Sequence, residues 1–112
     1  MDFSASEHDG VSHVVMRGRL DTPGVGEIET RFTASVVPLG RPTVIDLGQV
    51  DFVSSMGLRL LIGTARALSL RKAKLVLFGA QPLVVDTLES AGLSALVPIV
   101  AGESDALALA RA

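Results

Sequence analysis

Two adjacent serines, Ser54 and Ser55, are the side chains of this sequence best placed to do chemistry. They come after a short apolar run and precede a stretch with helical periodicity, so we expect their hydroxyls at the beginning of a helix. Serine is a preferred helix N-cap, and capping explains one of the two completely. The other hydroxyl needs a different explanation.

Gly57 occupies the third position of this expected helix, where a capping box would have Glu or Gln. Glycine at such a position costs about 0.5–1 kcal/mol relative to alanine. Close approach of a partner's backbone would account for the glycine, and so would tight packing of the helix on a sheet. Both explanations stay open at the level of the sequence.

The residues around the serines do not form a catalytic motif. A nucleophile elbow, G-x-S-x-G, would need glycine at Val53 or Ser54. The two histidines, His8 and His13, lie in the N-terminal part of the chain, and nothing places either beside Ser55 as a base. We therefore expect no catalytic residue and no enzymatic activity.

Metal and cofactor sites are not expected either. The chain has no cysteine, and its histidines lack H-E-x-x-H spacing. The segment beginning at Gly24 starts like a dinucleotide fingerprint, but Glu29 replaces the third glycine and would repel a pyrophosphate. The segment beginning at Gly40 lacks the G-K-[ST] ending of a phosphate loop. The basic residues between positions 71 and 74 are interpreted as a solvated helix end that offsets the helix dipole.

Composition predicts one small packed domain. The chain has 112 residues, 48% of them hydrophobic and 20% charged, with a net charge of -2. This balance argues against nucleic acid as a partner. The longest charge-free run, between Glu89 and Glu103, is too short to span a bilayer, and the N-terminus does not resemble a signal peptide. We expect no membrane insertion and a cytoplasmic location.

The order of the predicted elements indicates an α/β fold. An N-terminal hairpin turns at Asp9-Gly10 and ends near Met16, and further strands are expected at 43–47, 74–78 and 96–100. Helices are expected from about Asp21 or Thr22 to Val36, and at 56–69, 82–90 and 103–111. Parallel crossovers then give a mixed five-stranded sheet with about four helices packed mainly on one side.

The helix at 56–69 is expected to bury one apolar stripe on the sheet. The stripe consists of Leu58, Leu61, Ile62, Ala65 and Leu68. We also expect the loops before the first two helices to meet at one end of the sheet. They would form a partner-binding surface from Asp21, Ser54, Ser55, Met56 and Arg59, although Asp21 could merely cap the first helix.

The segment from Asp46 to Leu58 resembles the core motif of STAS domains, the family named for sulfate transporters and anti-sigma factor antagonists. The matching pattern is Asp46-Leu47-x-x-Val50-x-Phe52-x-x-Ser55-x-Gly57-Leu58. Further similar fragments are Gly18-x-Leu20-Asp21, Leu75-x-Leu77-x-Gly79, Leu88-x-x-Ala91-Gly92-Leu93 and Ala106-Leu107. The order and spacing of these fragments cover nearly the whole chain.

For a stand-alone member, the resemblance implies an anti-sigma factor antagonist. Such a protein binds an anti-sigma factor that is also a serine kinase of the GHKL ATPase type. Phosphorylation of a serine at the head of the second helix, here Ser55, ends the binding, and a serine/threonine phosphatase restores the antagonist. The family often has Asp before this serine, where this chain has Ser54. That departure leaves open an unphosphorylated STAS subunit of a bacterial phospholipid-transport ABC complex.

The two serines are expected to have different roles. Ser54 is the better N-cap, because its side chain can reach the backbone N–H groups of Met56 or Gly57. Ser55 would then be the first helical residue, with its hydroxyl pointing outward. We predict that Ser55 accepts the phosphate and that Ser54, the less favoured acceptor, holds the helix end.

Overall fold

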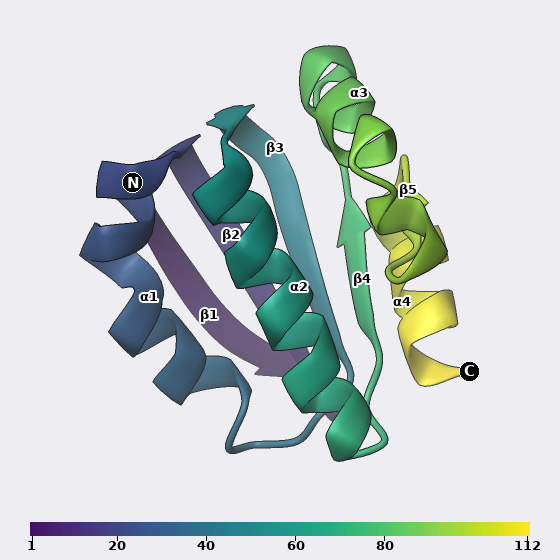
Figure 1. Ribbon diagram of the computed structural model, residues 1–112. Helices are drawn as coiled ribbons and strands as arrows, with labels where there is room; N and C mark the ends of the chain where they lie inside the picture. Colours follow the sequence, from purple (N-terminus) through teal and green to yellow (C-terminus); the bar gives the residue numbers. More distant parts are fainter.

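The computed structural model describes residues 1–112, in which two consecutive strands are followed by helices and strands in alternation (Figure 1). The strands are β1 (Asp2–His8), β2 (Val11–Leu20), β3 (Thr43–Val53), β4 (Leu75–Phe78) and β5 (Ile99–Val100). The helices are α1 (Thr22–Val36), α2 (Ser55–Leu70), α3 (Pro82–Ser90) and α4 (Glu103–Arg111), with a short 3-10 turn at Leu93–Ala95. None of the helices is both long and apolar enough to cross a membrane.

The five strands form one mixed sheet in the order β1-β2-β3-β4-β5. β1 and β2 are antiparallel and turn at Asp9-Gly10, where both residues have positive φ, as the predicted two-residue hairpin requires. The other neighbouring pairs are parallel. The predicted mixed five-stranded sheet is confirmed. Because β2 and β3 are parallel, their carboxyl ends meet, and Leu20 pairs with Val53.

Four predicted strand boundaries are wrong. β2 runs to Leu20 and does not end near Met16, because its second half pairs with β3. β3 runs to Val53 and not to Leu47, because β2 extends to Leu20 and supplies a partner along the whole length. β5 begins at Ile99 and not at position 96, because the chain first forms the 3-10 turn, in which Leu96 and Val97 donate to the Leu93 carbonyl. β4 begins at residue 75 and not at 74.

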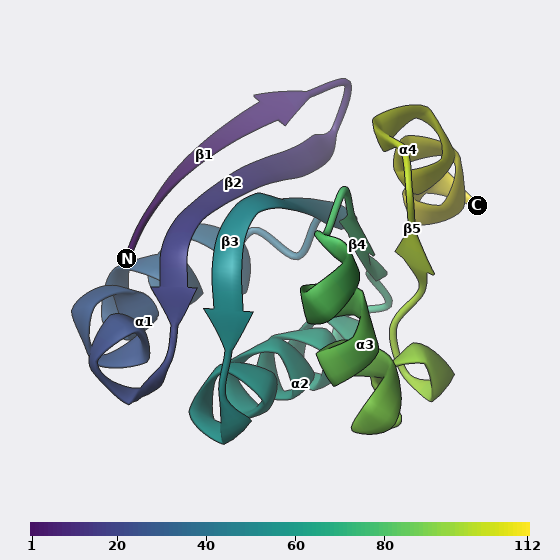
Figure 2. The same ribbon diagram turned by 90° about the horizontal axis from the view of Figure 1, so that it is seen from above.

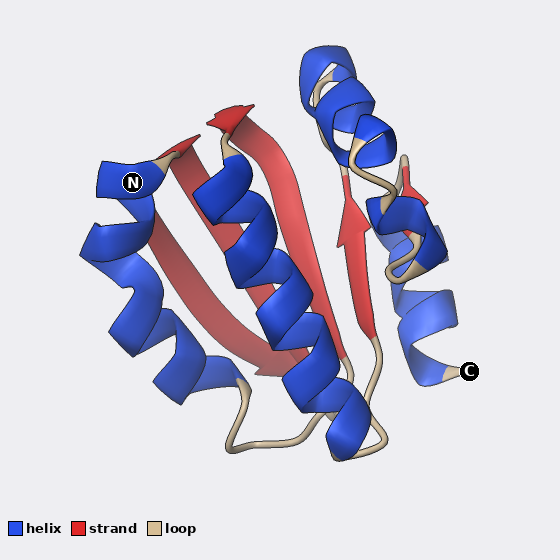
Figure 3. Cartoon of the chain, viewed as in Figure 1, coloured by secondary structure: helices blue, strands red, loops and turns tan.

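Helices cover the two faces of the sheet unequally (Figures 2 and 3). The larger core lies under α1, α2 and α3 and contains Phe32, Leu61 and Leu88, all fully buried. α4 alone packs on the other face, where Ala106 and Ala110 join a smaller apolar cluster. The expected arrangement, with helices mainly on one side, is confirmed.

The stripe predicted for α2 is partly correct. Leu61, Ala65 and Leu68 are buried as expected, whereas Leu58 and Ile62 are only half-buried at the edge of the core. The helix also buries Leu60 and Thr64, which the prediction omitted. These two residues lie on the flank that faces α1, and a periodicity argument cannot show which neighbour will cover a flank.

Candidate functional site

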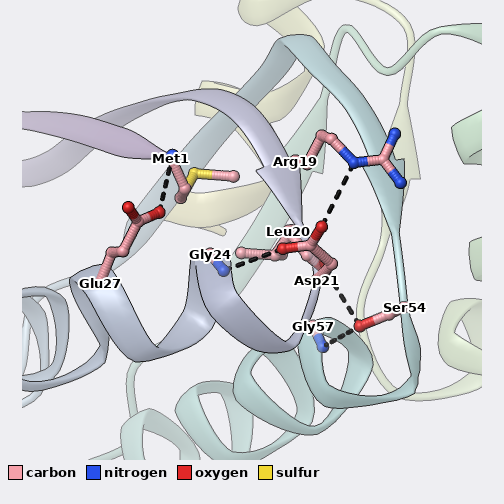
Figure 4. Close-up of polar contacts among 8 residues, drawn as sticks. All are labelled: Met1, Arg19, Leu20, Asp21, Gly24, Glu27, Ser54 and Gly57. Atoms are coloured by element: carbon pink, nitrogen blue, oxygen red, sulfur yellow. Dashed lines mark hydrogen bonds and ion pairs between the residues drawn. The ribbon is translucent and has the colours of Figure 1, made fainter.

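Ser54 is the N-cap of α2, as predicted. Its backbone is extended (φ -94°, ψ 179°), and its hydroxyl accepts a hydrogen bond from the Gly57 N–H at 3.4 Å. The same hydroxyl donates to the Leu20 carbonyl at 3.3 Å, and the Ser54 N–H donates to that carbonyl at 3.0 Å. The side chain therefore joins the beginning of α2 to the end of β2 (Figure 4).

Ser55 is the first residue of α2 and makes none of the side-chain hydrogen bonds of its neighbour Ser54. Its side chain is exposed, and its hydroxyl makes no hydrogen bond within the chain. Since Ser54 already caps the helix, the Ser55 hydroxyl is not needed for helix structure. It is available to solvent at the positive end of the helix dipole.

Tight packing on the sheet accounts for Gly57. A Cβ at this position would collide with the carbonyl oxygen of Leu20 and would lie 2.9 Å from its Cγ. The third position of α2 therefore sits directly against the end of β2. Of the two explanations open from the sequence, packing within the chain is sufficient.

Asp21 caps α1 in the neighbouring loop. Its carboxylate accepts from the Gly24 N–H at 2.9 Å and from Arg19 Nε at 3.2 Å (Figure 4). The hydrogen bond from Gly24 is the main cause that lowers the pKa of Asp21 below its ordinary value; desolvation opposes it, and Arg19 reinforces it. The side chain is 25% exposed and carries a negative charge at neutral pH.

The two loops lie side by side, as predicted. Ser54 bonds to Leu20, which immediately precedes Asp21, so the beginnings of α1 and α2 meet at the end of β2. Met56 is half-buried against the core, and Arg59 is exposed one turn further along α2 with no ion pair in the chain. The structure thus brings the five expected surface residues to one end of the molecule. Their contact with a partner stays a prediction.

The sequence-based surface omitted Arg19 and Phe52. The Arg19 guanidinium lies over the Phe52 ring at 4.5 Å, next to its bond with Asp21. Phe52 is 41% exposed and lies beside Arg19 and Asp21, so it is a candidate contact residue of this surface. Phe52 belongs to the motif noted in the sequence, but its pairing with Arg19 depends on the register of β2 and β3.

The histidines lie far from Ser55. Both belong to the β1–β2 hairpin, at the opposite end of β2 from Leu20. The His13 ring stacks on Phe78, and its Nε2 atom lies 2.9 Å from a Glu103 carboxylate oxygen of α4. His13 therefore lies between the sheet and α4. Neither histidine can act as a base for Ser55 in this arrangement.

Comparison with known proteins agrees with this geometry. The model of the STAS domain family matches residues 2–106. BtrV of Bordetella bronchiseptica, described as an anti-sigma factor antagonist, is 30% identical over 99 residues, which are 88% of this chain and 85% of that protein.

Solved structures share the fold. An anti-sigma factor antagonist from Mycobacterium paratuberculosis is 28% identical, with a TM-score of 0.88 over 99% of this chain and 94% of the other. The Bacillus protein SpoIIAA, solved in a phosphorylated form, is 18% identical, with a TM-score of 0.70 over 95% of this chain and 96% of the other. At that identity the second likeness shows the fold alone.

Proposed function

The chain belongs to the STAS domain family, among the anti-sigma factor antagonists, and from this premise we propose that phosphorylation of Ser55 switches its binding to an anti-sigma factor. The observation that carries the proposal is the exposed, unbonded Ser55 hydroxyl beside a cap already supplied by Ser54. The proposed partner is a serine kinase of the GHKL ATPase type, acting in the cytoplasm. A serine/threonine phosphatase reverses the modification.

The fold tolerates a phosphate at this position. A phosphoserine carries about -1.5 to -2 charges, and a helix N-terminus gains roughly 0.3–1 kcal/mol from a nearby negative group. No core side chain has to move, because Ser55 is exposed. The free energy of unfolding should therefore change little on phosphorylation.

The interface does not tolerate the same phosphate. A charge buried without a partner costs several kcal/mol, and each 1.4 kcal/mol is a factor of ten in affinity. Phosphorylation of Ser55 thus removes binding and leaves the domain folded.

Phosphorylation of matched variants by the cognate kinase with ATP tests the proposal, with intact mass and site mapping as readouts. Wild type and Ser54→Ala should each gain one phosphate at Ser55. Ser55→Ala should gain none and should stay bound to the kinase, and Ser55→Asp should bind more weakly, though less weakly than the phosphoprotein. Phosphate on Ser54 alone would reverse the assignment.

A second function is favoured by one observation, the serine at position 54 where the family often has Asp. A STAS subunit of a phospholipid-transport ABC complex would bind its ATPase without phosphorylation. Phosphate on neither serine, together with co-purification of transporter components, would favour this function. Co-purification of a kinase-like anti-sigma factor would exclude it.

A further inference from the structure

Four cations gather at the end of the molecule opposite Ser55. Arg41 comes from the loop between α1 and β3, and Arg71, Lys72 and Lys74 come from the turn between α2 and β4. Figure 1 shows that both connections lie at the same end of the sheet. None of these four side chains forms an ion pair within the chain.

Direct contacts hold the two segments together. The Thr43 N–H donates to the Lys74 carbonyl at 2.8 Å. The Arg71 side chain covers Gly40, where an added Cβ would lie 2.6 Å from Arg71 Nε. The cations are therefore neighbours in a folded surface, although Arg41 is 30 positions or more from the other three in sequence.

The helix dipole explains only part of this cluster. Arg71 and Lys72 directly follow the C-terminus of α2, where positive charge is favourable. Arg41 belongs to another segment and is not required by that helix. Two apolar side chains are also exposed here, Leu39 at 50% and Leu70 at 89%. We name the set the basic end patch; its members are Leu39, Arg41, Leu70, Arg71, Lys72 and Lys74.

A hollow of about 350 Å³ adjoins the basic end patch. Leu39 and Arg41 line it together with Ala5, Ser6, Glu7, Ser12 and Ser35, and the Glu7 carboxylate accepts a hydrogen bond from the Gly10 N–H at 3.0 Å. Ser12 is only 3% exposed, and its hydroxyl oxygen has no hydrogen-bond partner. The site is concave, and its wall offers apolar atoms, the unpaired guanidinium of Arg41 and one carboxylate, that of Glu7, which is already bonded within the chain.

We propose that the basic end patch binds an acidic segment of a partner protein that inserts one apolar side chain into the hollow. Carboxylates of that segment pair with Arg41 and Arg71, since guanidinium groups bind carboxylates in a bidentate geometry. A lipid surface fits less well, because a flat bilayer would leave the hollow empty. The 16 residues of α2 span about 24 Å between Ser55 and this patch, so the site is separate from the proposed switch.

Peptide titration of the isotope-labelled full chain tests the proposal. The probe is a short amidated peptide in which one leucine is flanked on each side by three glutamates. We expect chemical-shift changes confined to residues 39–41 and 70–74 and to Ser12. Replacing the peptide's leucine by serine should weaken binding several-fold.

Charge-reversal variants sharpen the test. Arg41→Glu and Arg71→Glu should each weaken the peptide's affinity about tenfold or more. Arg66→Glu is the matched control, because Arg66 is exposed on α2, has no ion pair and lies outside the patch. The affinity of the Arg66→Glu variant for the peptide should differ from that of wild type by less than about threefold. Lys74→Glu serves as a second variant if thermal unfolding shows that one of the arginine variants is not folded.

Four results would overturn the proposal. The first is the absence of chemical-shift changes at millimolar peptide, and the second is chemical-shift changes at the Ser55 end of the molecule. The third is a loss of peptide affinity in Arg66→Glu equal to that in the patch variants, and the fourth is occupation of the patch by another kind of partner. The last is checked with vesicles of phosphatidylcholine and phosphatidylserine, and by sedimentation for a second copy of the chain. Binding to either that depends on Leu70 and Arg71, without peptide binding, assigns the patch to a lipid surface or to self-association.

Discussion

The beginnings of α1 and α2 are built on one plan but differ at their surfaces. In each, the cap side chain accepts from the N–H of a glycine three positions later, Asp21 from Gly24 and Ser54 from Gly57. Each glycine lies against a carbonyl at the end of β2, where a Cβ would collide with Arg19 or Leu20. The shared plan places both helices tightly on the sheet.

The two helix ends differ in the cap and in the residues just after it. α1 begins with a charged cap held by Arg19. Its first residue, Thr22, is exposed and also has a hydroxyl without a hydrogen bond, and Pro23 follows it. α2 begins with a neutral cap whose bond to Gly57 is long, and the next residue presents the free hydroxyl of Ser55. Both helix ends therefore have an exposed hydroxyl at the first helical residue, and they differ in the cap before it, which is a carboxylate held by an ion pair in α1 and a neutral serine in α2.

The largest expected effect comes from removing the side chains that anchor the two helix ends. Ile28 and Leu61 each lie seven residues after their cap and are fully buried. Ile28→Ala and Leu61→Ala should each lower the free energy of unfolding by about 2–5 kcal/mol. Denaturant unfolding measures both. A loss below about 0.5 kcal/mol for either would show that its helix is not packed as described.

The glycines test the shared plan next. Gly24→Ala and Gly57→Ala should each destabilise the fold by about 1–3 kcal/mol, because the new methyl group overlaps a backbone oxygen. Gly26 and Gly63 are matched controls on the same two helices, since a Cβ there meets nothing within 4 Å. Alanine at these controls should stabilise by about 0.5–1 kcal/mol. Equal behaviour of all four variants in thermal unfolding would contradict the close approach.

The serines test the difference between cap and free hydroxyl. Ser54→Ala should cost about 0.5–2 kcal/mol, the usual loss for a cap. Ser55→Ala should change stability by less than about 0.5 kcal/mol, as exposed residues without partners do. Chemical denaturation of the two variants beside wild type decides the matter. A larger loss of stability in Ser55→Ala than in Ser54→Ala would mean that Ser55 is the cap and Ser54 has the free hydroxyl.

The smallest expected effect is a change of stability at acidic pH, and only the cap of α1 should cause it. Because the pKa of Asp21 is lower in the folded chain, the unfolded chain binds this proton more readily, and stability rises with pH through that window. The contribution of the Asp21 carboxylate to stability is fully present above its ordinary pKa of 3.8. It is lost as the pH falls through the lower pKa of the folded chain.

Asp21→Asn isolates this contribution, since asparagine also caps helices but does not titrate there. The difference in unfolding free energy between wild type and Asp21→Asn should be constant above about pH 5 and should shift against wild type below about pH 4. Ser54→Ala should show no such pH-dependent difference. A difference that stays flat down to about pH 2 would mean that the Asp21 carboxylate is not held as described.

Local chemistry was sufficient to predict most elements of this fold. The hairpin is explained by Asp9-Gly10, which tolerates positive φ, and the α2 boundary by a serine cap beside an apolar repeat. The assignment of Ser54 as cap and Ser55 as first helical residue likewise needed only the spacing to Gly57. Each of these features depends on contacts between residues a few positions apart, so the order of residues is enough to predict it.

Contacts between distant segments needed the tertiary structure. The length of β3 was underestimated because its second half is stabilised by β2, across a pairing that only the register defines. The same register sets Arg19 over Phe52, and helix packing makes Leu60 and Thr64 buried. The basic end patch arises from two turns that fold against each other, so the sequence alone presented its cations as an ordinary helix end.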